Sequence, residues 1–280
     1  MTTTLRPEQP EDVRPDGSRT RRWLICVNGR PVGSLRTTAT PYGEQRWGTI
    51  SELEVTEGLR RGRATVGALA AEEVLRGWGC NRADVTVPAG NEAALGLARL
   101  LGYTERMRNM AKRLGRPPEL PDGLTVRPIG AERFDAWLAE AKEGYVAHLT
   151  GSGLAEQQAR EKADADHRQL LLQGHATPGT ALRELLDAQG TVLGTLWLTL
   201  RQKQLPDGSP LAWVMTVEVG REHRGAGHGR TLMRLAEREC LAAGVADLGL
   251  NVFSSNEVAI RLYESLGYRL TRRVLGKRLL

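Results

Sequence analysis

Val217-Glu218-Val219, followed shortly by Arg224-Gly225-Ala226-Gly227-His228-Gly229, is the most informative part of this chain. A β-branched run, a glycine-rich turn and an amphipathic segment follow one another here, so the sequence predicts a strand, a bare loop and a helix N-terminus. Glycines have no Cβ atom, so the turn can adopt positive φ angles and bring successive N–H groups close to an anion. Because a helix N-terminus also favours negative charge, the stretch predicts a cradle for phosphate groups.

The residues around the turn narrow the class of ligand. Arg224 and Arg230 flank it and supply formal charge that backbone amides lack, so a diphosphate is expected. A Walker-type loop needs a Lys and then Ser or Thr after its last glycine, but Arg230-Thr231 stands there. A dinucleotide-binding fold has its glycine turn after the first strand, whereas this turn comes after several predicted strands. Both of these classes are therefore disfavoured.

A second element follows the turn. Residues 248–252 predict a short buried strand, and Asn256 then opens a helical pattern that ends before Gly267. Tyr263 lies on this helix, where its phenol faces either the core or a ligand. A phenol with a pKa of about 10 stays protonated at neutral pH and can donate a proton.

Together, R-x-x-G-x-G at residues 224–229 and N-x-x-A-x-x-L-Y-x-x-x-G-Y at residues 256–268 resemble the acetyl-CoA-binding core of the GNAT acetyltransferases. The resemblance is close over residues 211–275. It implies an α/β (α+β) fold with a mixed, twisted sheet that splays open beside the turn and is flanked by helices. In that fold the pantetheine arm would pair with the strand like an added β-strand. The implied acetyl-CoA contacts are Val217, Val219, Arg224, Gly225, Ala226, Gly227, His228, Gly229, Arg230 and Asn256.

The resemblance also implies an activity, which is direct acetyl transfer to a primary amine of a small molecule such as an antibiotic or a metabolite. Tyr263 is expected to protonate the leaving thiol, and Glu218 is the candidate base, although strand alternation turns its side chain toward either the acceptor or solvent. Two alternatives stay open: a non-catalytic acetyl-CoA-binding module, and an acyltransferase that uses a longer acyl-CoA. His223 and His228 are expected to contact cofactor or water, and His148, His167 and His175 to lie at the surface.

The chain contains an internal repeat. Residues 91–103 align with residues 256–268, an offset of 165 (256 − 91), and the same offset places Gly62 on Gly227. The first copy has Ala98 where the second has Tyr263, and Ala98 cannot donate a proton. We therefore expect two tandem domains of which the first is degenerate and non-catalytic. Its basic residues Arg60, Arg61 and Arg63 either hold a cofactor or form a solvated surface.

The predicted domain boundary lies in a Pro- and Gly-containing stretch. We expect a first domain at residues 1–115, a linker at 116–123 and a catalytic domain at 124–280. After the linker the pattern predicts a strand, two helices at 134–145 and 154–172, and three strands at 182–186, 191–200 and 212–219. The first copy has no room for the two helices, which in the family help to wall the acceptor site.

Composition limits the remaining possibilities. The net charge of +6 comes mainly from scattered Arg, without a basic run that alternates with aromatics, so no nucleic-acid partner is expected. Richness in Arg, Ala and Gly suggests a bacterial genome rich in G and C. Three cysteines without metal-ligand spacing predict buried thiols and no metal site. No apolar leader or membrane span is evident, so we expect a cytoplasmic protein, either a pseudo-dimeric monomer or a homodimer.

Overall fold

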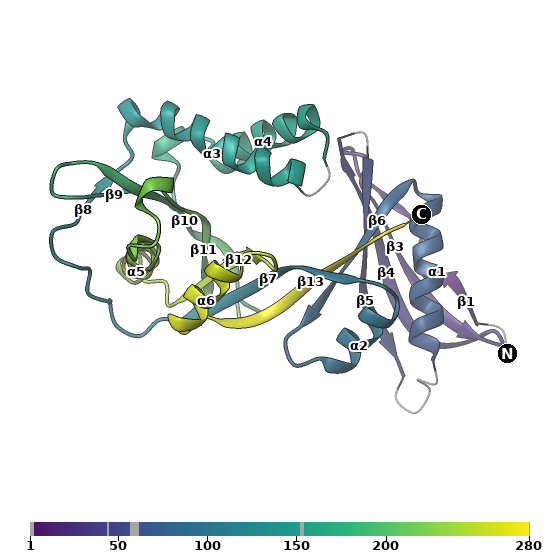
Figure 1. Cartoon of the computed structure of the whole chain (residues 1–280). Helices are drawn as coiled ribbons and strands as arrows, with labels where there is room; N and C mark the ends of the chain where they lie inside the picture. Colours follow the sequence, from purple (N-terminus) through teal and green to yellow (C-terminus); the bar gives the residue numbers. More distant parts are fainter. Residues whose placement is uncertain (1–2, 44, 57–61, 152–153, 280) are drawn as a thin grey trace. The chain divides into compact units, whose positions relative to one another are not determined.

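A computed structural model describes residues 3–43, 45–56, 62–151 and 154–279 of the chain. The chain forms two compact units (Figure 1). The N-terminal unit comprises Met1–Met107 together with Arg272–Leu280, and the C-terminal unit comprises Arg108–Thr271. Each unit has its own core.

A mixed sheet forms the N-terminal unit, with strand order β1-β3-β4-β5-β6-β13 and β2 paired to β3. Only the β5–β6 pair is parallel among the pairings described in this unit. Leu35 and Ile25, both fully buried, lie in its core together with Leu75 of the first helix. The elements are β1 (Thr3–Pro7), β2 (Asp12–Val13), β3 (Arg19–Val27), β4 (Arg30–Tyr42), β5 (Gln45–Val55), α1 (Arg63–Gly77), β6 (Cys80–Pro88), α2 (Glu92–Leu100) and β13 (Arg269–Arg278).

The C-terminal unit repeats this plan with strand order β7-β12-β11-β10-β9-β8. β11 and β12 are parallel, and β8 to β11 form antiparallel neighbours. Two helices precede β9, as the sequence predicted. The elements are β7 (Thr104–Arg113), β8 (Thr125–Pro128), α3 (Ala131–Gly151), α4 (Glu156–Leu170), η1 (Gly174–Ala176), β9 (Thr180–Leu186), β10 (Val192–Gln204), β11 (Pro210–Val219), η2 (Arg221–His223), α5 (His228–Ala242), β12 (Asp247–Phe253) and α6 (Glu257–Ser265).

The two copies share helix boundaries at the offset of 165. α1 and α5 begin at Arg63 and His228, and each follows a left-handed glycine with φ of 76° at Gly62 and 88° at Gly227. α2 and α6 begin after Asn91 and Asn256, whose side chains accept hydrogen bonds from backbone N–H groups three residues on, at 3.0 and 3.1 Å. These caps satisfy donors that a helix N-terminus leaves unpaired. Local sequence signals therefore determine both helix pairs.

Both second helices also end in the same way. Gly102 and Gly267 have positive φ, and the N–H groups of the tyrosines that follow them donate to the carbonyls of Ala98 and Tyr263 at 3.0 Å. This is a Schellman motif, in which a left-handed glycine lets the chain reverse and satisfy the last carbonyls of a helix. The motif buries the tyrosine after each glycine, Tyr103 at 3% and Tyr268 at 2% exposure.

Most of the last strand of each copy belongs to the compact unit of the other copy. β13 pairs antiparallel with β6 from Arg272↔Pro88 to Arg278↔Arg82, so the C-terminal end of the chain completes the N-terminal sheet. The second half of β7 belongs to the C-terminal unit, where the N–H of Leu114 donates to the carbonyl of Ala246 at 2.7 Å. The equivalent bond, from Leu279 to Asn81, is 2.8 Å long.

In each unit, an ion pair joins the strand from one copy to a helix of the other copy. Lys112 on β7 contacts Glu237 on α5 at 2.7 Å, and Lys277 on β13 contacts Glu72 on α1 at 2.8 Å. Both glutamates are almost fully buried, and the two pairs correspond at the offset of 165. Each lysine therefore neutralises a carboxylate that belongs to the other copy.

The compact units differ from the predicted domains 1–115 and 124–280 because of this exchange. The predicted linker at 116–123 lies within the C-terminal unit, and its Leu120 packs against that unit's core. The alternation of a single strand shows which of its faces is buried, but it does not show which of two similar sheets the strand joins.

Candidate functional site

The glycine turn between β11 and α5 has the predicted backbone geometry. Gly225 has a φ of 83° and Gly227 a φ of 88°, both in the left-handed region that favours glycine. Nothing lies within 4 Å of the position that a Cβ atom would occupy on either residue. The turn is therefore open on its outer side.

The amides of this turn, the backbone N–H groups of residues 225–229, have no hydrogen-bond acceptor in the described ranges. No side chain caps α5, and the first bond at its N-terminus runs from the Arg230 N–H to the Gly227 carbonyl at 3.0 Å. Unpaired N–H groups at a helix N-terminus bind anions well because the helix dipole adds to their partial charges. These residues fit the diphosphate of a coenzyme.

Two arginines flank the turn, with different surroundings. Arg224 is exposed, and its Nε donates to the carbonyl of Val219 at 3.3 Å. Arg230 donates from Nη2 to Ser265 Oγ at 2.8 Å, which joins the start of α5 to the end of α6. Arg224 is thus the more accessible of the two cations, while Arg230 also holds the two helices together. His228 is half-buried at the start of α5.

β11 and β12 separate beside the turn. Their parallel pairing runs from Leu211↔Asp247 to Val214↔Leu250, but β11 continues to Val219 and β12 to Phe253. On its other side β11 stays paired with β10, with Thr195 opposite Glu218 and Gly194 opposite Val219. A Cβ atom on Gly194 would lie 2.4 Å from the Glu218 carbonyl oxygen, so only glycine permits this approach. The edge of β11 beyond Val214 is left available for an extended ligand.

α6 brings Tyr263 close to this region. A Cβ atom on Gly229 would lie 3.3 Å from Leu262 of α6 and 3.9 Å from Val219 of β11, so the strand end, the turn and the helix meet at one point. Tyr263 packs against the core, with its ring centroid 6.1 Å from that of Tyr268. Burial raises the pKa of Tyr263 above its ordinary value, so the phenol keeps its proton at neutral pH.

The other predicted site residues have simpler environments. Asn256 uses its side-chain oxygen to cap α6, which leaves its amide NH₂ group for other partners. Glu218 is exposed on β11, and its side chain has no ion-pair partner among the described residues. Val217 and Val219 pack partly against the core.

Two histidines that were expected at the surface are instead buried or half-buried. His167 on α4 is 5% exposed, and its Nδ1 lies 2.8 Å from the Ala163 carbonyl oxygen. His148 on α3 lies against Phe253, the last residue of β12, with ring centroids 3.5 Å apart. Its Nε2 is buried without a hydrogen-bond partner, and burial lowers its pKa. The sequence contained no signal for this contact because it joins segments about a hundred residues apart (253 − 148).

The equivalent region of the N-terminal unit contains a cavity of about 810 Å³. Its wall contains Gly62 and Asn91, the counterparts of Gly227 and Asn256, and it has Ala98 in place of Tyr263. The loop that corresponds to the glycine turn, with Arg60 and Arg61, lies outside the described residues. This unit therefore keeps the space for a ligand and lacks the phenol.

The thiols and carboxylates offer no metal site in the described residues. Cys26, Cys80 and Cys240 are free and buried, and no group of three His, Cys, Asp or Glu side chains there has an arrangement suited to a metal ion. None of the helices in the described ranges has the length and apolar character needed to span a membrane.

The fold and the turn together define a two-copy protein whose C-terminal unit can bind an anionic coenzyme along a splayed sheet. The sequence profile of the Acetyltransferase (GNAT) family matches residues 2–103 and 136–268. The chain belongs to this family; it is an N-acetyltransferase that uses acetyl-CoA.

Relatives cover most of the chain. It is 29% identical to a mycothiol acetyltransferase of Thermobispora bispora over 91% of its own length and 83% of the relative. It is 30% identical to a protein of the same name from Thermomonospora curvata, over 89% and 79% of the two lengths. Among solved structures, a tandem GNAT protein from the clavulanic acid biosynthesis pathway has a TM-score of 0.58 at 20% identity, covering 96% of this chain and 85% of that one. This likeness confirms the tandem fold.

Proposed function

We propose that the C-terminal unit transfers the acetyl group of acetyl-CoA directly to a primary amine of a small molecule, and that the N-terminal copy is non-catalytic. The observation that carries this proposal is the set of unpaired amides at residues 225–229, which lies beside the helix that bears Tyr263. Only the C-terminal copy combines a glycine turn with a tyrosine at this place in the repeat.

The chain's own residues have three tasks in this reaction. The amides of residues 225–229 and the Arg224 guanidinium hold the diphosphate, and the free edge of β11 near Val219 orients the pantetheine arm. Bound acetyl-CoA supplies the activated thioester. Tyr263 holds its proton because burial raises its pKa, and it gives this proton to the departing sulfur.

The acceptor is a small-molecule amine. Two observations support this class: relatives named mycothiol acetyltransferase cover most of the chain, and the chain has the two helices, α3 and α4, that the family resemblance implies for an acceptor wall. The amine on which those relatives act is the first acceptor to test, followed by polyamines and aminoglycosides. We also propose a cytoplasmic location, which the three free buried cysteines support because disulfides are rare in that compartment.

A direct assay tests the proposal. The full-length protein is incubated with acetyl-CoA and a panel of amines, and acetylated products are identified by mass spectrometry. The same panel with hexanoyl-CoA tests the alternative of a longer acyl donor, since faster transfer from hexanoyl-CoA would favour it. Binding of acetyl-CoA by calorimetry without any acetylated product would favour the other alternative, a binding module.

A further inference from the structure

The proposed reaction also needs a residue that removes the proton of the acceptor nitrogen. The acceptor nitrogen loses a proton when it is acylated, and a positioned base speeds such a step. Glu218, the candidate from the sequence, has an exposed side chain and no partner that holds it in place among the described residues. The structure offers a second group, His148, which contacts Phe253 at the end of β12.

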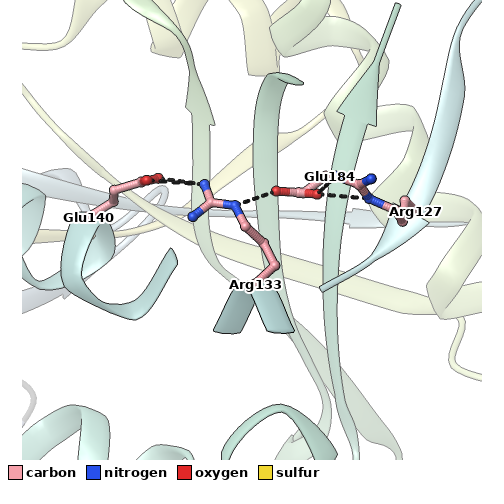
Figure 2. A network of polar contacts seen from close by, with 4 residues as sticks. All are labelled: Arg127, Arg133, Glu140 and Glu184. Atoms are coloured by element: carbon pink, nitrogen blue, oxygen red, sulfur yellow. Dashed lines mark hydrogen bonds and ion pairs between the residues drawn. The ribbon is translucent and has the colours of Figure 1, made fainter. Parts of the chain in front are cut away.

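α3 is firmly anchored where it begins. Glu184 on β9 is fully buried and accepts hydrogen bonds from Arg133 Nε of α3 at 2.9 Å and from Arg127 Nη2 of β8 at 2.6 Å (Figure 2). The Nη2 of Arg133 also donates a hydrogen bond to Oε2 of Glu140, on the same helix, at 2.9 Å (Figure 2). Charge-assisted bonds to a buried carboxylate have a well-defined geometry, so they hold the helix in place on the sheet.

Aromatic packing continues this anchoring along α3. The ring of Trp137 meets that of Trp197 on β10 edge-on, with centroids 5.7 Å apart, and both side chains are buried. The start of α3 is thus held against the C-terminal sheet by contacts that do not involve any ligand. His148 follows about three turns later on the same helix.

His148 lies at the divergent end of the strand pair. It contacts Phe253, which follows the last paired residue of β12, Leu250. The carbonyl of Phe253 accepts a hydrogen bond from the N–H of Asn256 at 2.9 Å, and Asn256 caps the helix that carries Tyr263. His148 therefore stands next to the segment that links the splayed strand to the helix of the expected acid.

The ring of His148 has an unused nitrogen. Its Nε2 is buried and has no partner among the described residues, whereas the Nδ1 of His167, on the neighbouring helix, lies 2.8 Å from the Ala163 carbonyl oxygen. Buried polar atoms in proteins are nearly always hydrogen-bonded, so an unpaired one calls for an explanation. A partner that arrives with the substrate provides one.

We propose that His148 Nε2 accepts the proton of the acceptor nitrogen during acetyl transfer. This inference rests on the proposed function. In the step, the nitrogen–carbon bond to the acetyl group forms and the carbon–sulfur bond of the thioester breaks. The nitrogen's proton goes to His148 Nε2, and the departing sulfur takes the proton of the Tyr263 hydroxyl. Both residues return to their starting states by exchanging a proton with solvent.

The surroundings of His148 keep its imidazole in the basic form. Burial lowers the pKa of the ring, so it is neutral at pH 7 and one nitrogen can accept a proton. Several of the charged groups on α3, α4 and β12 form ion pairs with one another or with Arg113. These pairs are Lys142–Asp164, Arg160–Glu143, Lys162–Asp166 and Arg113–Asp247, with Tyr145 also bonded to Asp166.

The test compares matched histidine variants of the full-length protein. His148→Gln removes the titrating ring, and His175→Gln is the control because His175 is an exposed histidine of the same unit. The acceptor is whichever of the relatives' amine, spermidine or kanamycin the wild type acetylates fastest. We expect His148→Gln to lower kcat about 10²–10⁴-fold and to remove the acid limb of the kcat/KM profile, while the calorimetric Kd for acetyl-CoA stays unchanged.

A stability measurement separates catalysis from structure. His148→Leu replaces an unpaired buried nitrogen by apolar atoms, so we expect its Tm to equal or exceed that of the wild type while its activity falls as in His148→Gln. A lower Tm that accounts for the lost activity would overturn the assignment. So would a rate within twofold of wild type in His148→Gln, or loss of the acid limb in Glu218→Gln alone. Failure of the wild type to acetylate any amine would overturn the proposed function, and the role of His148 with it.

Discussion

The two copies of the repeat share a scaffold and differ in chemistry. Both have a left-handed glycine before the first helix, an asparagine cap before the second helix and a buried lysine–glutamate pair. The C-terminal copy has Tyr263 where the N-terminal copy has Ala98, and all five histidines of the chain lie in the C-terminal unit. The comparison teaches that two copies can keep the same caps and cores while they differ at the proposed site, because the two depend on different side chains.

The largest expected effect on kcat comes from Tyr263, the position at which the two copies differ. Tyr263→Phe keeps the ring and its packing but removes the hydroxyl, so we expect kcat to fall about 10²–10³-fold with little change in acetyl-CoA affinity. Steady-state kinetics and calorimetry on the same preparation measure both quantities. An unchanged kcat would show that the tyrosine is not the acid.

The glycines before the first helices provide a second contrast. Gly227→Val places a β-branched side chain at a φ of 88°, which costs about 1–3 kcal/mol of strain and displaces the amides of the turn. We expect acetyl-CoA binding by the C-terminal unit to fall at least tenfold.

Gly62→Val is the matched variant in the N-terminal copy. It introduces similar strain at a φ of 76° in the wall of the N-terminal cavity. We expect it to leave acetyl transfer unchanged and to remove a second calorimetric binding event if the wild type shows one. Equal loss of activity in both variants would contradict the assignment of catalysis to the C-terminal copy.

The exchanged strands predict that each unit depends on a lysine of the other copy. Lys277→Met leaves Glu72 buried without its nearest cation and should destabilise the N-terminal unit by about 3 kcal/mol. Adding Glu72→Gln should recover much of this loss, because the uncompensated charge is then gone. Urea unfolding monitored by hydrogen exchange reports on each unit separately. A loss confined to the C-terminal unit would argue against the exchange.

The smallest expected effect is a difference in acid sensitivity. Burial lowers the pKa of His148 and of His167, both in the C-terminal unit, so the unfolded chain takes up these protons first as the pH falls below about 6.5. The C-terminal unit should therefore lose about 1 kcal/mol or less between pH 7 and 5.5.

In the N-terminal unit, Asp84 should contribute in the opposite sense. Burial raises the pKa of Asp84, so this carboxyl binds its proton more readily in the folded state than in the unfolded chain. This contribution to stability grows as the pH falls. Hydrogen exchange at the two pH values compares the units, and equal losses in both would contradict the expectation.

Much of the fold was predictable because its signals are local. The repeat, the glycine turn, the asparagine caps and the order of two helices and three strands before the turn all appeared in the sequence and are present in the structure. Caps and turns depend on residues three or four positions apart, so the sequence contains both partners. The pattern around Arg224 and Asn256 was also sufficient to indicate the family that the profile match confirms.

The candidate site was predictable only in part. The sequence indicated the turn and Tyr263, but it placed His148 at the surface, and the structure puts its ring against Phe253. It also left open whether the N-terminal copy has room for a ligand, where the structure has a cavity of about 810 Å³. Neither feature has a pattern along the chain, because each arises where segments that are distant in sequence pack together.

The amino-acid sequence by itself determined the two-copy architecture and the open glycine turn, since short-range periodicity and backbone freedom at glycine suffice for both. Tertiary structure alone decided that most of β7 joins the C-terminal unit and most of β13 the N-terminal unit. It also decided that His148 contacts Phe253 at the end of β12. Strand alternation and helical amphipathicity report which face of an element is buried. The identity of the neighbour that buries it depends on how the whole chain packs.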